Sequence, residues 1–176
     1  MIELVDYIRL LSKDGRLVTA EQVIAVAGLD LEIEDVEVAH QQLIEDTQYQ
    51  DVAIIAGEKD HYFYSKRFIV STYATQWVGV KDGKLIETMA SYIRRYSSMG
   101  ELVAASNFTH PPYNLEQTEL ATLKEKFSHT EGCEDIHFQL DRQNNSDTQG
   151  YYFSIKTMTT TYAKVLADHD PFEWSA

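Results

Sequence analysis

Apolar residues recur every three or four positions in the first dozen residues of the chain, as the buried face of a helix requires. Ile2, Val5 and Ile8 follow this spacing, and Gly15 comes shortly afterwards as a stop signal. The same spacing returns twice before residue 47, and it then changes to the period of two that is typical of strands. The pattern therefore predicts a helical first part followed by a β-hairpin.

The elements predicted for the first half follow one another without long gaps. A short extended piece lies between the first two helices, and Thr19 is placed to cap the second of them. In order, we predict a helix over 2–12, a short strand over 16–18, helices over 20–27 and 34–46, a hairpin of 51–56 and 61–65, and a helix over 67–77.

Two stretches of this first half reappear in the second half in the same order. Residues 6–18 match residues 91–103 at seven of thirteen positions, and the aromatic stretch 62–74 is similar to 151–163. Self-similarity at a fixed offset is typical of repeated structural units. We predict that the second copy has a helix over 85–97, a shortened helix within 102–110, a helix from 114, strands at 136–140 and 151–155, and a helix over 157–167.

The element order is that of a winged-helix domain, so we predict an α+β protein made of a tandem duplication of a winged-helix-like unit. Each unit would contain a helix, a short strand, two helices, a β-hairpin and a final helix. Gly79 and the Asp82-Gly83 turn indicate the boundary. The predicted domains are repeat 1 over 1–78, a linker over 79–84, repeat 2 over 85–167 and a C-terminal tail over 168–176.

Composition and charge narrow the classes of partner. The chain has 176 residues, 44% of them hydrophobic, and a formal net charge of -13. This charge repels nucleic acids and anionic membranes at long range, so we expect neither DNA nor a membrane as the main partner. The single cysteine favours a reducing compartment, and we expect a cytoplasmic protein.

The third helix of the first unit is the element that would read DNA in a winged-helix protein. It carries Glu34, Asp35 and Glu37 and has no Lys or Arg. Phosphate contacts need cations, so this helix disfavours DNA binding. We expect these three acids to contact a protein partner, and a remote alternative is that they mimic nucleic acid.

The bases near the hairpin give the alternative interpretation. Lys59, Lys66 and Arg67 would form the wing of a DNA-binding transcription regulator. An ordinary solvated face with ion pairs also accounts for them.

Aromatic residues follow one another on the return strand of each hairpin. Tyr62 and Tyr64 share one face, whereas Phe63 and its equivalent Tyr152 point the other way. Core packing accounts for one face. We expect Phe63 and Tyr152 to contact a partner, because exposed aromatic side chains are common where proteins dock.

Arg9 and Arg94 occupy equivalent places in the two repeats. Their recurrence favours a structural role, and we expect each to pair with an acid of its own unit.

No catalytic, cofactor or metal motif is apparent. The chain has no Gly-x-Ser-x-Gly elbow, no phosphate-binding glycine loop and no His-Glu-x-x-His sequence. His129, Cys133 and His137 stand four apart without a fourth ligand. We expect no enzymatic activity, no cofactor and no bound metal.

In layout, length and acidity the chain is similar to the tandem winged-helix accessory proteins of chromosome-segregation complexes. That resemblance implies binding to a partner chain and not directly to DNA. Together with the charge, it favours a non-catalytic protein-protein interaction adaptor or regulatory subunit. A homo-oligomer is left open, as is the identity of the partner.

Overall fold

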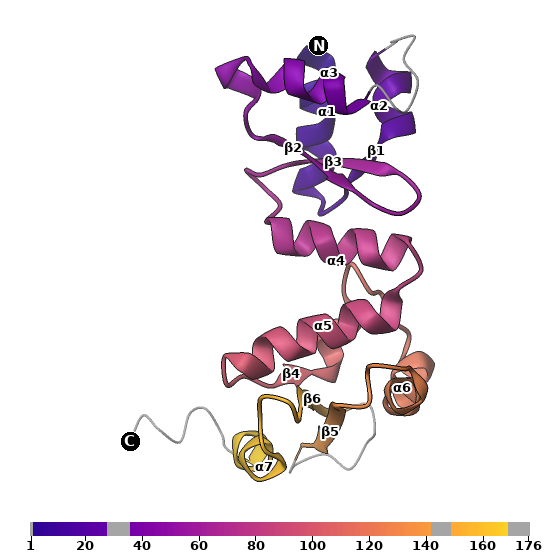
Figure 1. The fold of residues 1–176 in the computed structure, drawn as a ribbon, viewed down its shortest axis with the longest axis vertical. Helices are drawn as coiled ribbons and strands as arrows, with labels where there is room; N and C mark the ends of the chain where they lie inside the picture. Colours follow the sequence, from indigo (N-terminus) through magenta and orange to yellow (C-terminus); the bar gives the residue numbers. More distant parts are fainter. Residues whose placement is uncertain (1, 28–35, 142–148, 169–176) are drawn as a thin grey trace. The chain divides into compact units, whose positions relative to one another are not determined.

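The computed structural model describes residues 2–27, 36–141 and 149–168 (Figure 1). The chain divides into two compact units, Met1–Gly83 (unit 1) and Lys84–Ala176 (unit 2). Each unit has its own three-stranded antiparallel sheet, and the described residues form seven α-helices in all. The predicted α+β class is therefore confirmed at this level.

Unit 1 begins with three helices and ends with a fourth. Its elements are α1 (Ile2–Lys13), β1 (Val18–Thr19), α2 (Ala20–Ala27), α3 (Val36–Ile44), the 3-10 helix η2 (Thr47–Tyr49), β2 (Val52–Ala56), β3 (His61–Ser65) and α4 (Ser71–Lys81).

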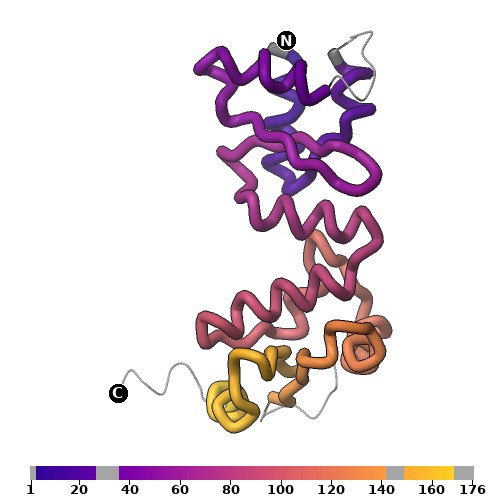
Figure 2. Tube along the Cα trace, viewed as in Figure 1, coloured from indigo at the N-terminus to yellow at the C-terminus, as the bar shows by residue number. Residues whose placement is uncertain are grey.

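The sheet of unit 1 has β3 in the centre, in the order β1-β3-β2. The hairpin of β2 and β3 lies between α1–α3 on one side and α4 on the other, as the Cα trace shows (Figures 1 and 2). Phe63 pairs with Val18 on β1 and with Ile54 on β2. Because helices cover both faces of the sheet, β3 is buried on both.

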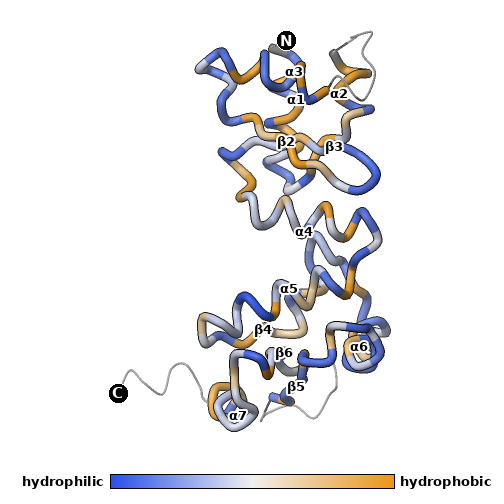
Figure 3. Tube along the Cα trace, in the orientation of Figure 1, coloured by the Kyte–Doolittle hydropathy of each residue, from blue (hydrophilic) through white to orange (hydrophobic). Residues whose placement is uncertain are grey.

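Two apolar clusters follow from this layering. The α1–α3 side contains Leu4, Val5, Ile8, Val18, Ala20, Val23, Val36, Leu43, Tyr49, Val52 and Phe63. The α4 side contains Leu17, Ala53, Tyr62, Tyr64, Ile69, Ala74 and Val78. The turn between the two strands is hydrophilic (Figure 3).

Unit 2 has the same strand order, β4-β6-β5. Its elements are α5 (Leu85–Ser98), β4 (Val103–Ala104), the 3-10 helix η3 (Ala105–Thr109), α6 (Gln117–His129), β5 (Ile136–Leu140), β6 (Gly150–Ser154) and α7 (Thr160–Asp168). The registers also agree, because Val103 pairs with Tyr152 as Val18 pairs with Phe63.

The core of unit 2 is built largely from aromatic rings. Tyr152 lies at the centre, with its ring centroid 4.9 Å from that of Phe138 and 5.4 Å from that of Phe127. Phe108 stands edge-on to Tyr113 at 5.1 Å. Edge-to-face contacts of this kind add to the free energy gained from burial alone.

Glycines end the first helix of each unit in the same way. Gly15 has φ +69° and Gly100 has φ +80°, and the next residue in each case donates its backbone N–H to the carbonyl five residues earlier at 3.0 Å. This is the Schellman termination, which requires the left-handed conformation that glycine adopts without strain. The predicted helix ends are confirmed at both positions.

Several element boundaries differ from prediction. The helices α4 and α7 start at Ser71 and Thr160, four and three residues after their predicted starts. The helix α4 continues to Lys81, so residues 79–81 of the predicted linker are helical. The shortened helix of unit 2 is the five-residue 3-10 helix η3. The next helix starts at Gln117, because Glu116 and Glu119 form its capping box and Asn114 has the left-handed φ of 52°.

The predicted cap of α2 is confirmed. The Gln22 backbone N–H donates to Thr19 Oγ1 at 3.2 Å, and the Thr19 N–H donates to Gln22 Oε1 at 3.1 Å. No helix in the described part of the chain has the length and apolar character needed to cross a membrane.

Candidate functional site

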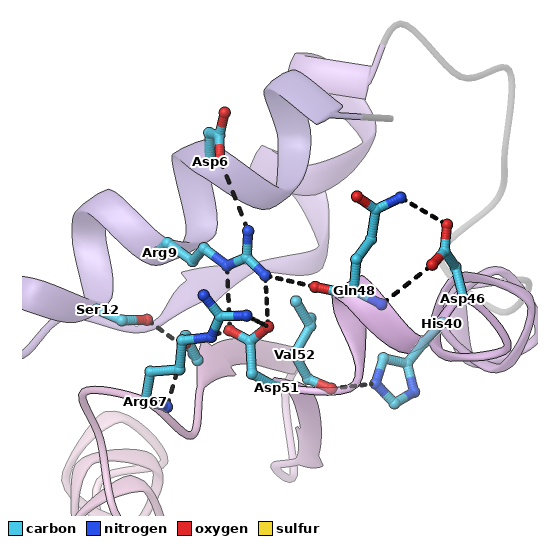
Figure 4. A network of polar contacts seen from close by, with 10 residues as sticks. Asp6, Arg9, Ser12, His40, Asp46, Gln48, Asp51, Val52 and Arg67 are labelled. Carbon is cyan, nitrogen blue, oxygen red and sulfur yellow. Dashed lines mark hydrogen bonds and ion pairs between the residues drawn. The ribbon is translucent and has the colours of Figure 1, made fainter.

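An arginine-aspartate pair ties the first helix of unit 1 to its hairpin (Figure 4). Arg9 on α1 donates from Nε to Asp51 Oδ2 at 3.1 Å and from Nη2 to Asp51 Oδ1 at 2.5 Å. Its Nη2 also donates to the carbonyl of Gln48 at 2.7 Å, in the 3-10 helix η2 that precedes β2. This bidentate geometry is the strongest that a guanidinium and a carboxylate form.

Two serines extend the pair into the sheet. Ser65 Oγ, at the end of β3, donates to Asp51 Oδ2 at 2.6 Å, and the Ser65 N–H donates to Ser12 Oγ on α1 at 2.9 Å. Arg67 adds a second cation, with its Nη2 3.3 Å from Asp51 Oδ1. Both carboxylate oxygens of Asp51 are thus engaged, and α1 is fixed to both hairpin strands.

Unit 2 contains the same network on the equivalent residues. Arg94 on α5 donates from Nε to Asp135 Oδ2 at 3.0 Å, and its Nη2 donates to Asp135 Oδ1 and to the carbonyl of Gly132. Ser154 Oγ donates to Asp135 Oδ2 at 2.5 Å, and the Ser154 N–H donates to Ser97 Oγ at 2.9 Å.

The second cation of the network is a lysine in unit 2. Lys156 stands two residues after Ser154, as Arg67 stands two residues after Ser65, and its Nζ lies 3.2 Å from Asp135 Oδ1. The predicted pairing of Arg9 and Arg94 with an acid of their own unit is therefore confirmed.

These contacts shift the ionisation of the carboxylates. The hydrogen bonds from Arg9 lower the pKa of Asp51 to about 2, against the opposing effect of burial and with help from Ser65. The hydrogen bonds from Arg94 likewise hold the pKa of Asp135 well below its usual range. The arginine pKa values are raised in return.

The chemistry of this network is structural. Asp51 and Asp135 stay ionised at neutral pH, and their oxygens accept hydrogen bonds from residues that hold the fold together. A general base needs a free lone pair within reach of a substrate proton, and neither carboxylate is placed to offer one. The described residues contain no group of three or more His, Cys, Asp or Glu side chains able to hold a metal ion.

The predicted aromatic contact residues are placed differently from our expectation. Phe63 is 3% exposed and Tyr152 is 1% exposed. Both point into the core on the side of the first three helical segments of their units, so the expectation that they contact a partner is wrong. The physical reason is that the central strand is covered on both faces, which leaves no exposed aromatic side.

The acidic residues of the third helix are described only in part. Glu37 lies on α3 with its side chain 63% exposed, and its Oε1 is 3.0 Å from His61 Nε2. It remains a candidate for partner contact. Glu34 and Asp35 lie outside the described residues.

The three predicted wing bases do not form one cluster. Lys59 lies in the turn that precedes β3, whereas Lys66 and Arg67 follow β3 at its other end. A strand of five residues spans about 17 Å. Arg67 is also paired with Asp51. The three bases therefore lie at the two ends of β3, and their contact with DNA stays a prediction.

The sequence pattern predicts the two arginines of the network but not the aspartates that they bind. Asp51 stands 42 residues after Arg9, and Asp135 stands 41 residues after Arg94. Each aspartate immediately precedes the first hairpin strand of its unit. The sequence does contain a signal for the network. An aspartate recurs just before the first hairpin strand, and serines recur inside both repeated stretches.

Comparison with known proteins places the second unit in a family. The model of the YdhW C-terminal domain matches residues 83–175, which is more than half of the chain and coincides with unit 2. The chain belongs to the YdhW C-terminal domain family. The family match thus includes the whole Arg94 and Asp135 network.

A curated relative agrees with this membership. Over 84 residues the chain is 32% identical to the uncharacterized protein YdhW of Escherichia coli strain K12, and the alignment covers 48% of this chain. The chain spans 37% of the length of that YdhW protein. No solved structure matches the chain.

Proposed function

We propose that this YdhW-like chain is a non-catalytic adaptor or regulatory subunit that binds another protein. Its scaffold is a winged-helix-like unit present in two copies that arose by tandem duplication. The equal strand orders, the equal registers and the network repeated on equivalent residues support this duplication. The buried free thiol of the single cysteine, Cys133, is consistent with action in the cytoplasm.

The proposal rests on one observation: the helices that would enter the DNA groove in a winged-helix scaffold expose few cations. The exposed residues of α3 include Glu37, Gln41 and Gln42; the helix has no Lys or Arg, and its one histidine, His40, is buried. In α6, the exposed Lys124 and Lys126 alternate with Glu125. Six to ten phosphate contacts are typical of a DNA-binding protein, and these helices do not supply them.

The experiment that tests the proposal measures two affinities on the same purified full-length chain. Binding to a fluorescent duplex DNA is followed by anisotropy at low and at moderate salt. Partner proteins are isolated by affinity purification from source cells, then re-expressed and titrated against the chain. We expect a stoichiometric protein complex and no salt-sensitive DNA binding.

Other outcomes separate the alternatives. Duplex DNA binding that falls steeply with salt, and that is lost when Lys66 and Arg67 are neutralised, would replace the adaptor with a transcription regulator. A partner that is a basic DNA-binding protein, displaced by DNA and weakened by Glu37→Gln, would favour nucleic-acid mimicry.

A further inference from the structure

Exposed cations and exposed apolar side chains lie together at the end of unit 1 where α1 and β3 finish. The hydrogen bond from the Ser65 N–H to Ser12 Oγ brings these two ends side by side. Beyond it, the Lys13 ammonium lies 5.4 Å from the centre of the Phe68 ring. We call this group of exposed side chains the unit 1 patch; it consists of Lys13, Lys66, Arg67, Phe68 and Val70.

The apolar part of the unit 1 patch faces solvent. Phe68 is 45% exposed and Val70 is 67% exposed, whereas Ile69 between them is buried in the α4-side core. The chain alternates here, so that one side chain anchors the segment and its two neighbours project outward. Large apolar side chains at this exposure are stabilised when a partner removes them from water.

The charges of the unit 1 patch are largely uncompensated. Within the described part of the chain, neither Lys13 nor Lys66 has a carboxylate within 4.0 Å. Arg67 reaches Asp51, but Arg9 and Ser65 already bind that carboxylate. The patch is therefore locally positive on a chain whose net charge is -13.

Unit 2 shows that the fold does not require these side chains. The repeated network fixes the equivalences, because Lys13 follows Ser12 as Ser98 follows Ser97, and Lys66 follows Ser65 as Ile155 follows Ser154. Only the network cation recurs, as Lys156. The positions of Lys13, Lys66, Phe68 and Val70 are occupied in unit 2 by Ser98, Ile155, Thr157 and Thr159.

We propose that the unit 1 patch is the docking surface for a partner segment in which carboxylates flank apolar side chains. This inference rests on the proposed adaptor function and names the partner chemistry for it. Carboxylates of the segment pair with Lys13 and Lys66, and its apolar side chains cover Phe68 and Val70. Charge complementarity speeds the association of the segment with the patch and fixes its orientation, and burial of apolar side chains supplies most of the affinity.

A nucleic acid fits this surface less well. The patch offers three cations, one of them shared with Asp51, which is below the number that DNA-binding proteins use for phosphates. The acidic surroundings add repulsion that a long polyanion experiences more strongly than a short peptide does.

The test is a selection of random short peptides displayed on phage, using the immobilised full-length chain. Selected peptides are synthesised with a fluorophore and titrated against variants by anisotropy. One variant combines Phe68→Ser with Val70→Ser, and another combines Lys13→Glu with Lys66→Glu. The matched controls in unit 2 are Leu140→Ser with Val165→Ser, and Lys126→Glu with Lys164→Glu, which change the same types of exposed side chain.

We expect the selected peptides to be rich in Asp and Glu beside apolar residues. Each patch variant should weaken their binding by about tenfold or more, and each control by less than about twofold. Amide hydrogen exchange of Ser65 and Ser154 checks that every variant is folded. If the apolar variant misfolds, the charge variant alone decides the outcome, since its side chains are on the surface.

Two results would overturn the inference. Peptides that are basic, or that bind the patch variants as tightly as the unmodified chain, place the docking surface elsewhere. The patch is a nucleic-acid site if a duplex or single-stranded oligonucleotide displaces the peptide and its own binding is weakened as much as that of the peptide by the variant with Lys13→Glu and Lys66→Glu. If a protein partner forms a complex that is insensitive to the patch variants, this inference fails while the adaptor function stands; if no protein partner binds at all, both fail.

Discussion

Unit 1 and unit 2 build the same polar network around different apolar cores. Leu43 in unit 1 and Phe127 in unit 2 both stand eight residues before the network aspartate, and both are buried. The first lies in a cluster made mainly of aliphatic residues, and the second lies against Tyr152. A core has to fill its volume with apolar atoms, whereas the network has to place particular donors against particular acceptors.

The difference teaches which residues define the scaffold. Arginine, aspartate and the two serines recur because each is a donor or acceptor in a fixed geometry. The exposed residues that flank the network do not recur: Lys13, Lys66, Phe68 and Val70 of the unit 1 patch have no counterpart of the same type in unit 2, and only the patch residue Arg67 recurs, as Lys156. Features that one unit has and the other lacks are therefore candidates for function, and features that both share are candidates for stability.

The largest expected effect is the loss of a network aspartate. Asp51→Ala or Asp135→Ala leaves a partly buried arginine without its counter-ion, which costs about 3–5 kcal/mol of unfolding free energy in that unit. Hydrogen exchange measured peptide by peptide should show the loss in the mutated unit. Asp6→Ala is the control, because Asp6 is 68% exposed and lies 3.8 Å from Arg9. If Asp6→Ala lowers the unfolding free energy as much as the loss of a network aspartate does, the structural role of the network is contradicted.

Acid should weaken both units through the same carboxylates. The folded pKa of Asp51, about 2, lies below the unfolded value of 3.8, so its contribution is present above about pH 4 and is lost as pH falls toward 2. The shift corresponds to about 2 kcal/mol. Urea unfolding between about pH 5 and pH 2 measures it. In Asp51→Asn this part of the pH dependence should vanish from unit 1; its persistence would assign the acid sensitivity to other groups.

Exchanging the core residues tests whether the cores are individually adjusted. Leu43→Phe overfills the aliphatic core, and Phe127→Leu removes ring contacts with Tyr152, so each should cost about 1–2 kcal/mol. Urea unfolding of the full chain gives the free energies. Leu43→Met, which keeps the volume nearly constant, is the control. If both exchanges are neutral, the aliphatic and aromatic cores are interchangeable and the contrast between the units is not one of packing.

The smallest expected effect distinguishes the two helix ends. Gly15→Ala and Gly100→Ala each place a Cβ on a left-handed residue, which costs about 1 kcal/mol. The cost should be greater at Gly15, because its Cβ would lie 3.2 Å from Tyr73 Oη, whereas at Gly100 the nearest atom, Tyr162 Oη, is 3.9 Å away. Thermal unfolding measures both, and a reversed order would contradict the contacts of the two tyrosines.

The repeated stretches predicted the element order and the role of Arg9 and Arg94, because they preserve helix spacing and the polar residues that the network needs. They did not predict the burial of Phe63 and Tyr152. The aromatic pattern alone predicts one exposed face on the central strand. The run from Tyr62 to Ser65 has no charged residue, which is typical of a strand covered on both sides.

The unit 1 patch was not predicted from the sequence either. Lys13 and Phe68 are 55 positions apart, and only the contact between Ser12 and Ser65 brings their neighbourhoods together. The signal was present as a difference between the two units, since Phe68 and Val70 align with Thr157 and Thr159. The residues that the two units share identify the scaffold and not the surface.

The central claim is that the arginine, aspartate and serines that recur in both units form a scaffold and do not themselves bind the partner. Double-mutant cycles on Arg9 with Asp51 and on Arg94 with Asp135, each measured for unfolding free energy and for affinity toward a selected peptide, test it most directly. We predict coupling energies of about 2–3 kcal/mol in both units, with peptide affinity unchanged wherever the chain is folded. A coupling near zero in either unit, or a loss of affinity without a loss of stability, would contradict the claim.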